Sequence, residues 1–200
     1  VFLAVKPQFL EGVLDEIRDS VKAGQIFISI APGKTLQWLG ERLGENTKVI
    51  RTMPNTPAMV GEGMTALCVN ELVTEEEIAL AVKLCDTFGK TEVIPEHLMD
   101  AVVGVSGSSP AYVFMFLEAM ADAAVADGMP RAQAYKFAAQ SVLGSAKLML
   151  ETGKHPGELK DMVCSPAGTT IQAVRVLEEK GFRSAVIEAQ TECVKKAKGM

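Results

Sequence analysis

The stretch VFLAVKPQFLEGVLDEIRDSVKAGQIFISI, residues 1–30, decides the fold class. It places two short apolar segments, residues 1–5 and 25–30, on either side of a helix-forming segment, residues 8–21. Apolar runs this short, bounded by turn residues, are typical of buried strands. Strand, helix and strand in this order predict a βαβ unit with parallel strands.

The same alternation continues to residue 94. Further strands are expected at residues 48–52, 64–69 and 91–94, and further helices at 35–43 and 75–88. Thr74 and Glu77 have the spacing of a capping box at the start of the last of these helices, and Gly89 ends it. Residues 1–95 are therefore expected to form a parallel, doubly wound α/β domain. The first segment, VFLAV, is apolar on both faces and needs a neighbour on each side, so we expect this domain to lack an N-terminal piece.

After Pro95 the strand patterns stop. Helices are expected at about residues 96–103, 110–127, 130–152, 156–162 and 166–179, with a last one at 182–198. The segment PAYVFMFLEAMADAAVAD, residues 110–127, is apolar almost all the way round, which indicates a helix buried on most sides. Residues 96–200 are therefore expected to form an all-α domain for substrate binding and dimerisation, with a second copy of the chain supplying part of this burial.

Composition excludes several classes of protein. The net charge of −5 argues against a nucleic-acid partner, because binding to phosphates needs a basic surface. No apolar run reaches the ~20 residues of a membrane span. The four cysteines lack CxxC spacing and look like reduced thiols, and two histidines do not make a His-rich metal site. We expect a cytoplasmic protein without a metal, a membrane partner or a nucleic-acid partner.

Three turn-rich segments follow predicted strands: Ala4–Pro7, Ser29–Gly33 and Met53–Pro57. Ligands of doubly wound sheets bind at the carboxyl ends of the strands, so these segments are candidates for a nucleotide site. Each could equally be an ordinary strand-to-helix turn. The Gly-rich fingerprint GxGxxG of dinucleotide sites is absent from the sequence, which a missing N-terminal piece would explain.

Two further loops rich in small residues precede helices. SGSSP, residues 106–110, is either a plain helix start or a surface that lets a planar ligand approach the backbone. SPAGTT, residues 165–170, is expected to start a helix at Pro166 with Ser165 as its cap. The amides near Gly168, Thr169 and Thr170 then favour an anion such as a carboxylate. A capped helix with a Thr-rich first turn is the alternative interpretation.

Taken together, these segments resemble pyrroline-5-carboxylate reductases, the enzymes of the last step of proline biosynthesis. The resemblance covers essentially the whole chain and rests on six segments in order: FLAVKP (2–7), MPNTP (53–57), SGSSPAY (106–112), GMPR (128–131), HPGELKD (155–161) and SPAGTTI (165–171). It implies a Rossmann-like domain, an interlocking helical dimerisation domain, NADPH or NADH as cofactor, and homodimers that can assemble into decamers.

The resemblance also implies roles for individual residues. It assigns cofactor contacts to Ala4, Val5, Lys6, Pro7, Ala31, Pro32 and Asn55, and places Gly107 and Pro110 near the nicotinamide. It assigns the substrate carboxylate and imine to Gly168, Thr169 and Thr170, with Ser165 shaping the loop and Glu96 at an acidic position near the substrate. Two positions depart from the family's pattern, because Ser109 and Ala167 stand where the family usually has glycine. Ala167 is expected to be tolerated if its φ is negative.

The expected reaction is hydride transfer from the nicotinamide to C5 of 1-pyrroline-5-carboxylate, which gives L-proline. A protonated imine is already electrophilic, so most of the catalysis is expected to be positioning, with Thr170 bonding the ring nitrogen. His155 is expected to start a short helix, not to act as an acid. Two alternatives stay open: a related reductase of imines or 3-hydroxy acids, and a non-catalytic dimerisation fragment. A 3-hydroxy-acid enzyme is expected to carry a lysine on its long helix, and residues 110–127 contain none.

Overall fold

The computed structural model describes residues 1–199, and these form two compact units. The first unit comprises Val1–Pro110 and the segment from Gln190 onward, and the second comprises Ala111–Ala189. The domain boundary that the sequence analysis placed after residue 95 marks the end of the strand patterns, and it stays a prediction.

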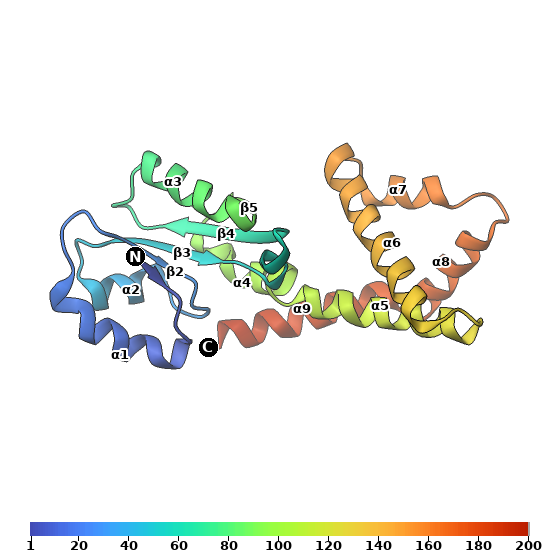
Figure 1. The fold of residues 1–200 in the computed structure, drawn as a ribbon, viewed down its shortest axis with the longest axis horizontal. Coiled ribbons are helices and arrows are strands. Elements are labelled where there is room, and N and C mark those ends of the chain that lie inside the picture. Colours follow the sequence, from blue (N-terminus) through green and yellow to red (C-terminus); the bar gives the residue numbers. More distant parts are fainter. Residues whose placement is uncertain (200) are drawn as a thin grey trace. The chain divides into compact units, whose positions relative to one another are not determined.

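The first unit is built on a sheet whose strands stand in chain order (Figure 1). The strands are β1 (Phe2–Leu3), β2 (Ile26–Ser29), β3 (Lys48–Met53), β4 (Gly63–Val69) and β5 (Gly89–Val93), and the helices between them are α1 (Pro7–Ile17), α2 (Leu36–Leu43) and α3 (Glu75–Cys85). Each strand and helix predicted for residues 1–94 is confirmed with shifted ends. The capping box of Thr74 and Glu77 is also confirmed, since each side chain bonds the other's backbone amide.

The prediction of an all-parallel sheet is wrong at one pair of strands. β1, β2 and β3 run parallel to one another, and β4 runs parallel to β5. β3 and β4 are antiparallel, with Ile50 opposite Val69. Only residues 54–62, with a short 3₁₀ turn at Thr56–Val60, join these two strands. A parallel connection needs a crossover of about a dozen or more residues, so this link allows only a reversal.

The reversal explains why helices cover both faces of the sheet. Right-handed crossovers between β1, β2 and β3 put α1 and α2 on one face, where Phe27 and Val49 join their core. Because β4 points the other way, a right-handed crossover from β4 to β5 passes over the opposite face. Helix α3 lies there, against Ile28 and Ile50 (Figure 1). Adjacent residues of one strand thus enter different cores, as the two-residue period of a strand requires.

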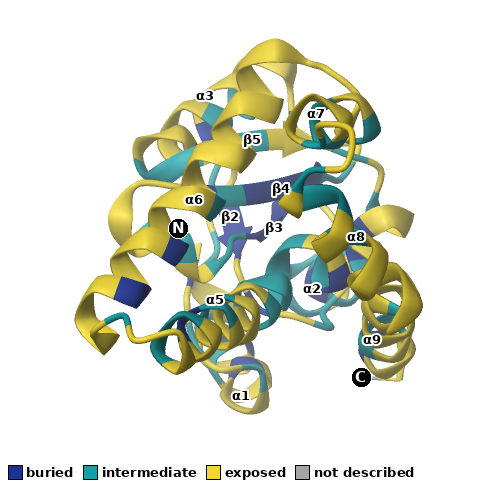
Figure 2. Ribbon diagram, turned by 90° about the vertical axis from the view of Figure 1, so that its right-hand side faces the viewer, coloured by how far each residue is buried: buried dark blue, intermediate teal, exposed yellow. Residues whose placement is uncertain are grey.

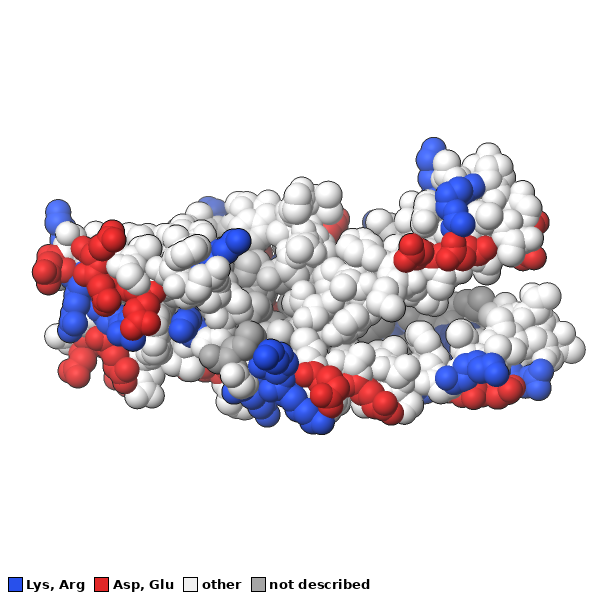
Figure 3. Space-filling model, turned by 90° about the horizontal axis from the view of Figure 1, so that it is seen from below, with Lys and Arg blue, Asp and Glu red and all other residues white. Residues whose placement is uncertain are grey.

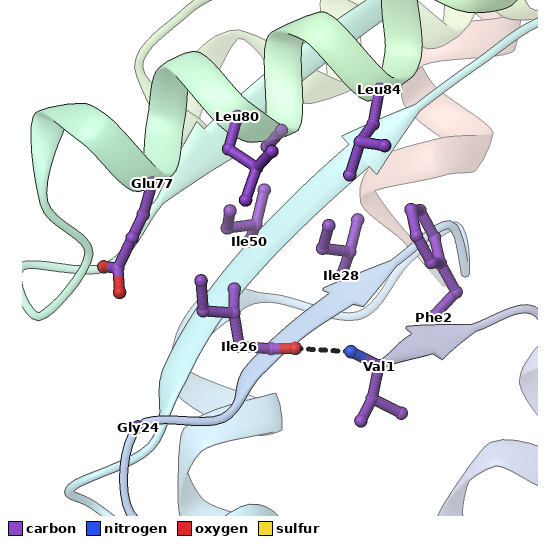
Figure 4. Close-up of a pocket in the computed structure, with 10 residues that line it drawn as sticks. Val1, Phe2, Gly24, Ile26, Ile28, Ile50, Glu77, Leu80 and Leu84 are labelled. Carbon is purple, nitrogen blue, oxygen red and sulfur yellow. Dashed lines mark hydrogen bonds between the residues drawn. The ribbon is translucent and has the colours of Figure 1, made fainter.

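β1 lies at an edge of the sheet. Among residues 1–199 it pairs with β2 alone, although its sequence predicted a neighbour on each side. Phe2 is 54% exposed. Beside it, an apolar pocket of about 260 Å³ opens between β1, the central strands and α3, where the side chains of Ile28, Leu80 and Leu84 converge (Figure 4).

Beyond β5 the chain enters an unbroken series of short helical segments. A 3₁₀ turn at Glu96–Leu98 leads into α4 (Met99–Val102) and then into a π turn at Val103–Gly107. Helix α5 (Ser109–Ala126) follows directly. The predicted helix at 96–103 is therefore confirmed in position, while its change of helical type was not predicted.

The second unit contains helices with little core of their own. They are most of α5 together with α6 (Arg131–Thr152), α7 (Pro156–Val163), α8 (Thr169–Glu179) and the first part of α9 (Phe182–Lys198). Within Ala111–Ala189 the buried hydrophobic residues are Ala121, Ala134 and Ala138, all small. Figure 2 accordingly shows long exposed stretches on these helices. Helix α5 is thus not buried by its own chain, since Phe114 is 63% and Met115 70% exposed.

Length and composition alone would allow the helical stretch Glu96–Ala126 to cross a membrane. The second part of this stretch is α5, several of whose large apolar side chains are exposed. Lys and Arg lie in mixed groups with Asp and Glu on the face of the molecule seen in Figure 3.

The link between α7 and α8 contains a tight turn that the sequence only partly predicted. The Gly168 amide donates to the Ser165 carbonyl oxygen at 3.0 Å, which closes a turn over Pro166 and Ala167. Ala167 has a φ of 58°, and within residues 1–199 it is the one non-glycine residue with positive φ. Proline followed by a residue of positive φ is the pattern of a type II turn. The helix therefore begins at Thr169, not at Pro166, and the condition under which Ala167 was expected to be tolerated is not met.

Replacing Ala167 by glycine should stabilise the protein. A non-glycine residue in the left-handed region costs about 1–2 kcal/mol, and glycine removes most of this cost. We expect Ala167→Gly to raise the free energy of unfolding by about 1 kcal/mol in urea denaturation of the complete protein.

Ala79→Gly is the matched control, since Ala79 lies exposed within α3. There the same change should lower the free energy of unfolding by about 1 kcal/mol. Equal destabilisation by both changes would show that Ala167 is not strained.

Candidate active site

The strand-end residues predicted from sequence lie along one edge of the sheet. Because β1, β2 and β3 are parallel, their carboxyl ends meet at this edge, and the segments after them follow there. The Ile30 amide donates to the Leu3 carbonyl oxygen at 3.2 Å, which holds the ends of β1 and β2 together. The segments Ala4–Pro7 and Ala31–Pro32 and residue Asn55 are thus brought together within the first unit.

These residues are not equally available to a ligand. Ala31 is 2% exposed and its amide donates to Ser29 Oγ at 3.3 Å, so it belongs to the core and Pro32 carries the exposed surface. Lys6 caps α1 without a side-chain hydrogen bond, and Pro7 stands at the first position of the helix. The surface at this edge therefore includes exposed Ala4, Lys6 and Pro32, with Pro7 half-buried.

Asn55 binds inside the protein through both ends of its side-chain amide. Oδ1 accepts from the Met64 amide at 2.8 Å, and Nδ2 donates to the Ser106 carbonyl oxygen at 3.1 Å. Asn55 was predicted to contact the cofactor. In the structure it joins the end of β3 to the start of β4 and to the π turn.

Gly107 and Pro110 lie half-buried on the loop that Asn55 reaches. A Cβ added to Gly107 would meet only the Val102 carbonyl oxygen at 3.8 Å and Val103 Cγ1 at 4.0 Å, which are ordinary contacts. The protein's own packing therefore does not require glycine here. A planar ring that approaches the backbone would require it, so this loop fits a nicotinamide.

The second group of predicted residues lies in the link from α7 to α8. Gly168 caps α8 without a side-chain hydrogen bond, and Thr169 and Thr170 are its first two helical residues. Ser165 does not act as the predicted cap, and the Gly168 amide is already bonded to the Ser165 carbonyl. The amides that a helix start offers to an anion are thus those from Thr169 onward.

Gly168 has a packing reason to be glycine. A Cβ there would lie 2.3 Å from Ser165 Oγ, so the serine hydroxyl fills the space beside it. Ser165 thus lies against Gly168 within this loop. The Thr170 side chain is half-buried, while Thr169 is exposed.

Glu96 belongs to the first unit, where it forms an ion pair. Its Oε1 accepts from Arg51 Nη1 at 3.0 Å and from the Leu36 amide at 2.7 Å, at the start of α2. The Arg51 side chain is 5% exposed, so Glu96 balances a buried charge. Burial, with the Glu96 carboxylate nearby, raises the pKa of the Cys68 thiol to about 12. Cys68 is therefore a neutral thiol at physiological pH and no nucleophile.

His155 takes a structural place. His155 caps α7, with Nδ1 accepting from the Gly157 amide at 3.0 Å, as expected of a helix start. Across residues 1–199, no group of three or more His, Cys, Asp or Glu side chains is placed to hold a metal ion.

Sequence reasoning missed two contacts of the candidate site. Ser108 Oγ lies 3.0 Å from Cys193 Sγ, a pair 85 residues apart. Arg51 was read only as part of a strand, although it is the buried partner of Glu96. An arginine that follows two apolar residues within a predicted strand was a signal, because such a charge needs a partner when buried.

Comparisons with known proteins indicate the family of this chain. The model of the family "Pyrroline-5-carboxylate reductase dimerisation" matches residues 96–200. The pyrroline-5-carboxylate reductase of Escherichia coli K12 is 62% identical over 197 residues, which are 98% of this chain and 73% of that protein.

Two solved structures are also similar over the whole chain. The pyrroline-5-carboxylate reductase of Coxiella burnetii has a TM-score of 0.92 at 36% identity, over 100% of this chain and 74% of that one. The Plasmodium falciparum enzyme, solved with NADP bound, has a TM-score of 0.91 at 31% identity, over 99% and 75% of the two chains. On the family match and on the identity to these relatives, the chain belongs to the pyrroline-5-carboxylate reductase family.

Proposed function

We propose that this chain reduces 1-pyrroline-5-carboxylate to L-proline, with the imine held at the start of α8 and NADPH or NADH at the carboxyl edge of β1–β3. The reaction is inferred from membership of the family. The observation that carries the substrate site is the start of α8, where backbone amides and two threonine hydroxyls follow a turn fixed by Ser165 and Gly168. The backbone amides match the carboxylate of the substrate, and a threonine hydroxyl matches the neighbouring ring nitrogen.

The substrate carboxylate binds the amides of Thr169 and Thr170. The first N–H groups of a helix have no partner within the helix, and the helix dipole favours a negative charge there. Gly168 contributes by lacking a side chain, because its own amide is used in the turn. Glu96 stays a proposed substrate contact, since its side chain is 32% exposed in the ion pair with Arg51.

The cofactor contacts the backbone of Ala4–Pro7, the surface of Pro32 and the loop from Gly107 to Pro110. When bound, a reduced nicotinamide supplies the hydride that is transferred to C5 of the imine. NADPH is proposed because the related Plasmodium falciparum enzyme was solved with NADP bound. NADH remains the alternative donor.

The protein's own part in the reaction is to orient and to polarise. The Thr170 hydroxyl bonds the ring nitrogen, which is next to the carbon that bears the carboxylate. This bond fixes the face of the ring that receives the hydride at C5. The nitrogen carries its proton before transfer and keeps it as the amine of proline, so no acidic side chain has to donate one.

A related reductase of 3-hydroxy acids is the alternative from sequence. Such an enzyme is expected to carry a lysine on its long helix, and α5 (Ser109–Ala126) contains none. Family membership also favours the imine.

Removing the Thr170 hydroxyl should weaken catalysis without weakening the binding of the cofactor. Loss of a hydrogen bond to a charged iminium costs about 1.5–3 kcal/mol, so we expect Thr170→Ala to lower kcat/KM for the imine roughly ten- to a hundredfold. Steady-state kinetics of the complete enzyme measure this effect, and fluorescence titration measures the affinity for NADPH.

Thr170→Ser keeps the hydroxyl and should restore most of the activity. Wild-type kcat/KM in Thr170→Ala would make Thr170 a helix-start residue only. A parallel loss of affinity for NADPH would mean that the loop had been assigned to the wrong ligand.

We also propose a homodimer built on α5 and α6, which can assemble further into a decamer. The family model supports self-association of residues 96–200. A groove of about 940 Å³ along α5, α8 and α9 is almost wholly apolar, with Met115, Phe116 and Phe182 among its lining residues. Burial of such a groove by a second copy gives the helices of the second unit the core that they lack alone.

Disruption of this groove should separate the subunits. Phe116→Lys would place a charge in an apolar interface that, for an obligate dimer, exceeds roughly 2,000 Å² in total. We expect the unchanged protein to sediment as a dimer or larger at micromolar concentration and Phe116→Lys to dissociate or aggregate. A stable wild-type monomer would contradict the proposal.

A further inference from the structure

The π turn at Val103–Gly107 is the irregular point of an otherwise continuous helical run. The Ser108 amide donates to the Val103 carbonyl oxygen at 2.8 Å, which is the i to i+5 bond of a π helix. Turns of this kind are rare and are found mostly at functional sites. The turn widens the helix just before Gly107, where the nicotinamide is proposed to bind.

One side of this turn is packed against α9. A Cβ on Gly104 would lie 3.1 Å from Val194 Cγ2 and 3.4 Å from the Gln190 carbonyl oxygen, so α9 packs closely against the turn at this glycine. Cys193 of the same helix contacts Ser108 Oγ. The turn therefore has a supporting surface behind it, in contrast to Gly107, where a Cβ would make only ordinary contacts.

The other side is held by the side chain of Asn55. A backbone N–H can only donate and a carbonyl oxygen can only accept, so the bonds to Met64 and Ser106 fix which end of the Asn55 amide faces which partner. The Ser106 carbonyl immediately precedes Gly107. One half-buried side chain thus ties the turn to the carboxyl end of β3 and to the first residues of β4.

We propose that Asn55 is a positioning residue for hydride transfer, which fixes the π turn and so sets the place of Gly107 against the nicotinamide. The inference rests on the proposed function for the ligand at Gly107. It differs from the cofactor contact expected from sequence, because Asn55 acts through the Ser106 carbonyl and not by touching the cofactor.

The chain contains a matched control at the other end of the same strand pair. Asn70 Oδ1 accepts from the Val49 amide at 3.2 Å, and its Nδ2 donates to the Thr47 carbonyl oxygen at 2.9 Å. Asn70 is half-buried like Asn55 and also bridges two backbone groups. It lies at the amino end of β3, away from the proposed cofactor edge.

The experiment compares Asn55→Asp with Asn70→Asp in the complete enzyme. An aspartate is nearly isosteric and can still accept from the amide, but when ionised it cannot donate to the carbonyl. Asn55→Asp should therefore release the turn and leave the Met64 bond in place. Hydrogen–deuterium exchange of peptides that cover residues 103–110 reports the release, and kinetics with 4-deuterated NADPH report the hydride step.

We expect faster exchange of residues 103–110 in Asn55→Asp only. We also expect kcat at saturating substrates to fall about tenfold, the effect of one lost hydrogen bond, with a larger primary isotope effect. Asn70→Asp should keep kcat within about twofold and an unchanged isotope effect, although both variants lose stability. Partial recovery of Asn55→Asp at low pH, where a protonated aspartate can donate again, would support the assignment further.

Unchanged exchange of residues 103–110, or equal kinetic effects of the two variants, would overturn the inference. If Asn55→Asp does not fold, Asn55→Ala removes both bonds without adding a charge and is read in the same way. If the wild-type enzyme fails to reduce the imine, the proposed function is wrong, and the exchange measurement still decides whether Asn55 holds the turn.

Discussion

The reversal of strand direction between β3 and β4 is the constraint on which the rest of the first unit depends. The short link at residues 54–62 forces it, because no crossover helix fits there. It places the carboxyl ends of β1, β2 and β3 at the same edge as the start of β4. Asn55 lies in the link between these strands. Its two hydrogen bonds connect this link to the start of β4 and to the π turn.

The second unit is subject to a different constraint, because its helices do not form a hydrophobic core within one chain. Its buried hydrophobic residues are alanines, while large side chains such as Phe114 and Met115 stay exposed. Burial of apolar surface contributes about 25 cal/mol per Å², so covering these exposed side chains would stabilise the unit considerably. Association through residues 96–200, which the family model describes as a dimerisation region, would bury this apolar surface.

Periodicity predicted the elements well and their pairing less well. Residues such as Thr74 with Glu77, or Gly153 after α6, mark helix ends directly in the sequence. The direction of β4 was missed because its alternation is the same for a parallel and an antiparallel neighbour. The length of the preceding link carried that information and was not used.

Motifs indicated the segments of the candidate site, and what they could not indicate are contacts between distant residues. The pairing of Glu96 with Arg51 spans 45 positions, and no local pattern reveals it. The start of α8 was misplaced by three residues because Pro166 favours a helix start, whereas the positive φ of Ala167 prevents one. Occupation of the Gly168 amide by the Ser165 carbonyl follows from the same turn.

A crystal structure of the complete enzyme with L-proline and an oxidised dinucleotide tests the central claim most directly. The account predicts the proline carboxylate on the backbone amides of Thr169 and Thr170, with the ring nitrogen within hydrogen-bond distance of the Thr170 hydroxyl. Proline bound only at the strand ends of the first unit, with the start of α8 empty, would contradict it.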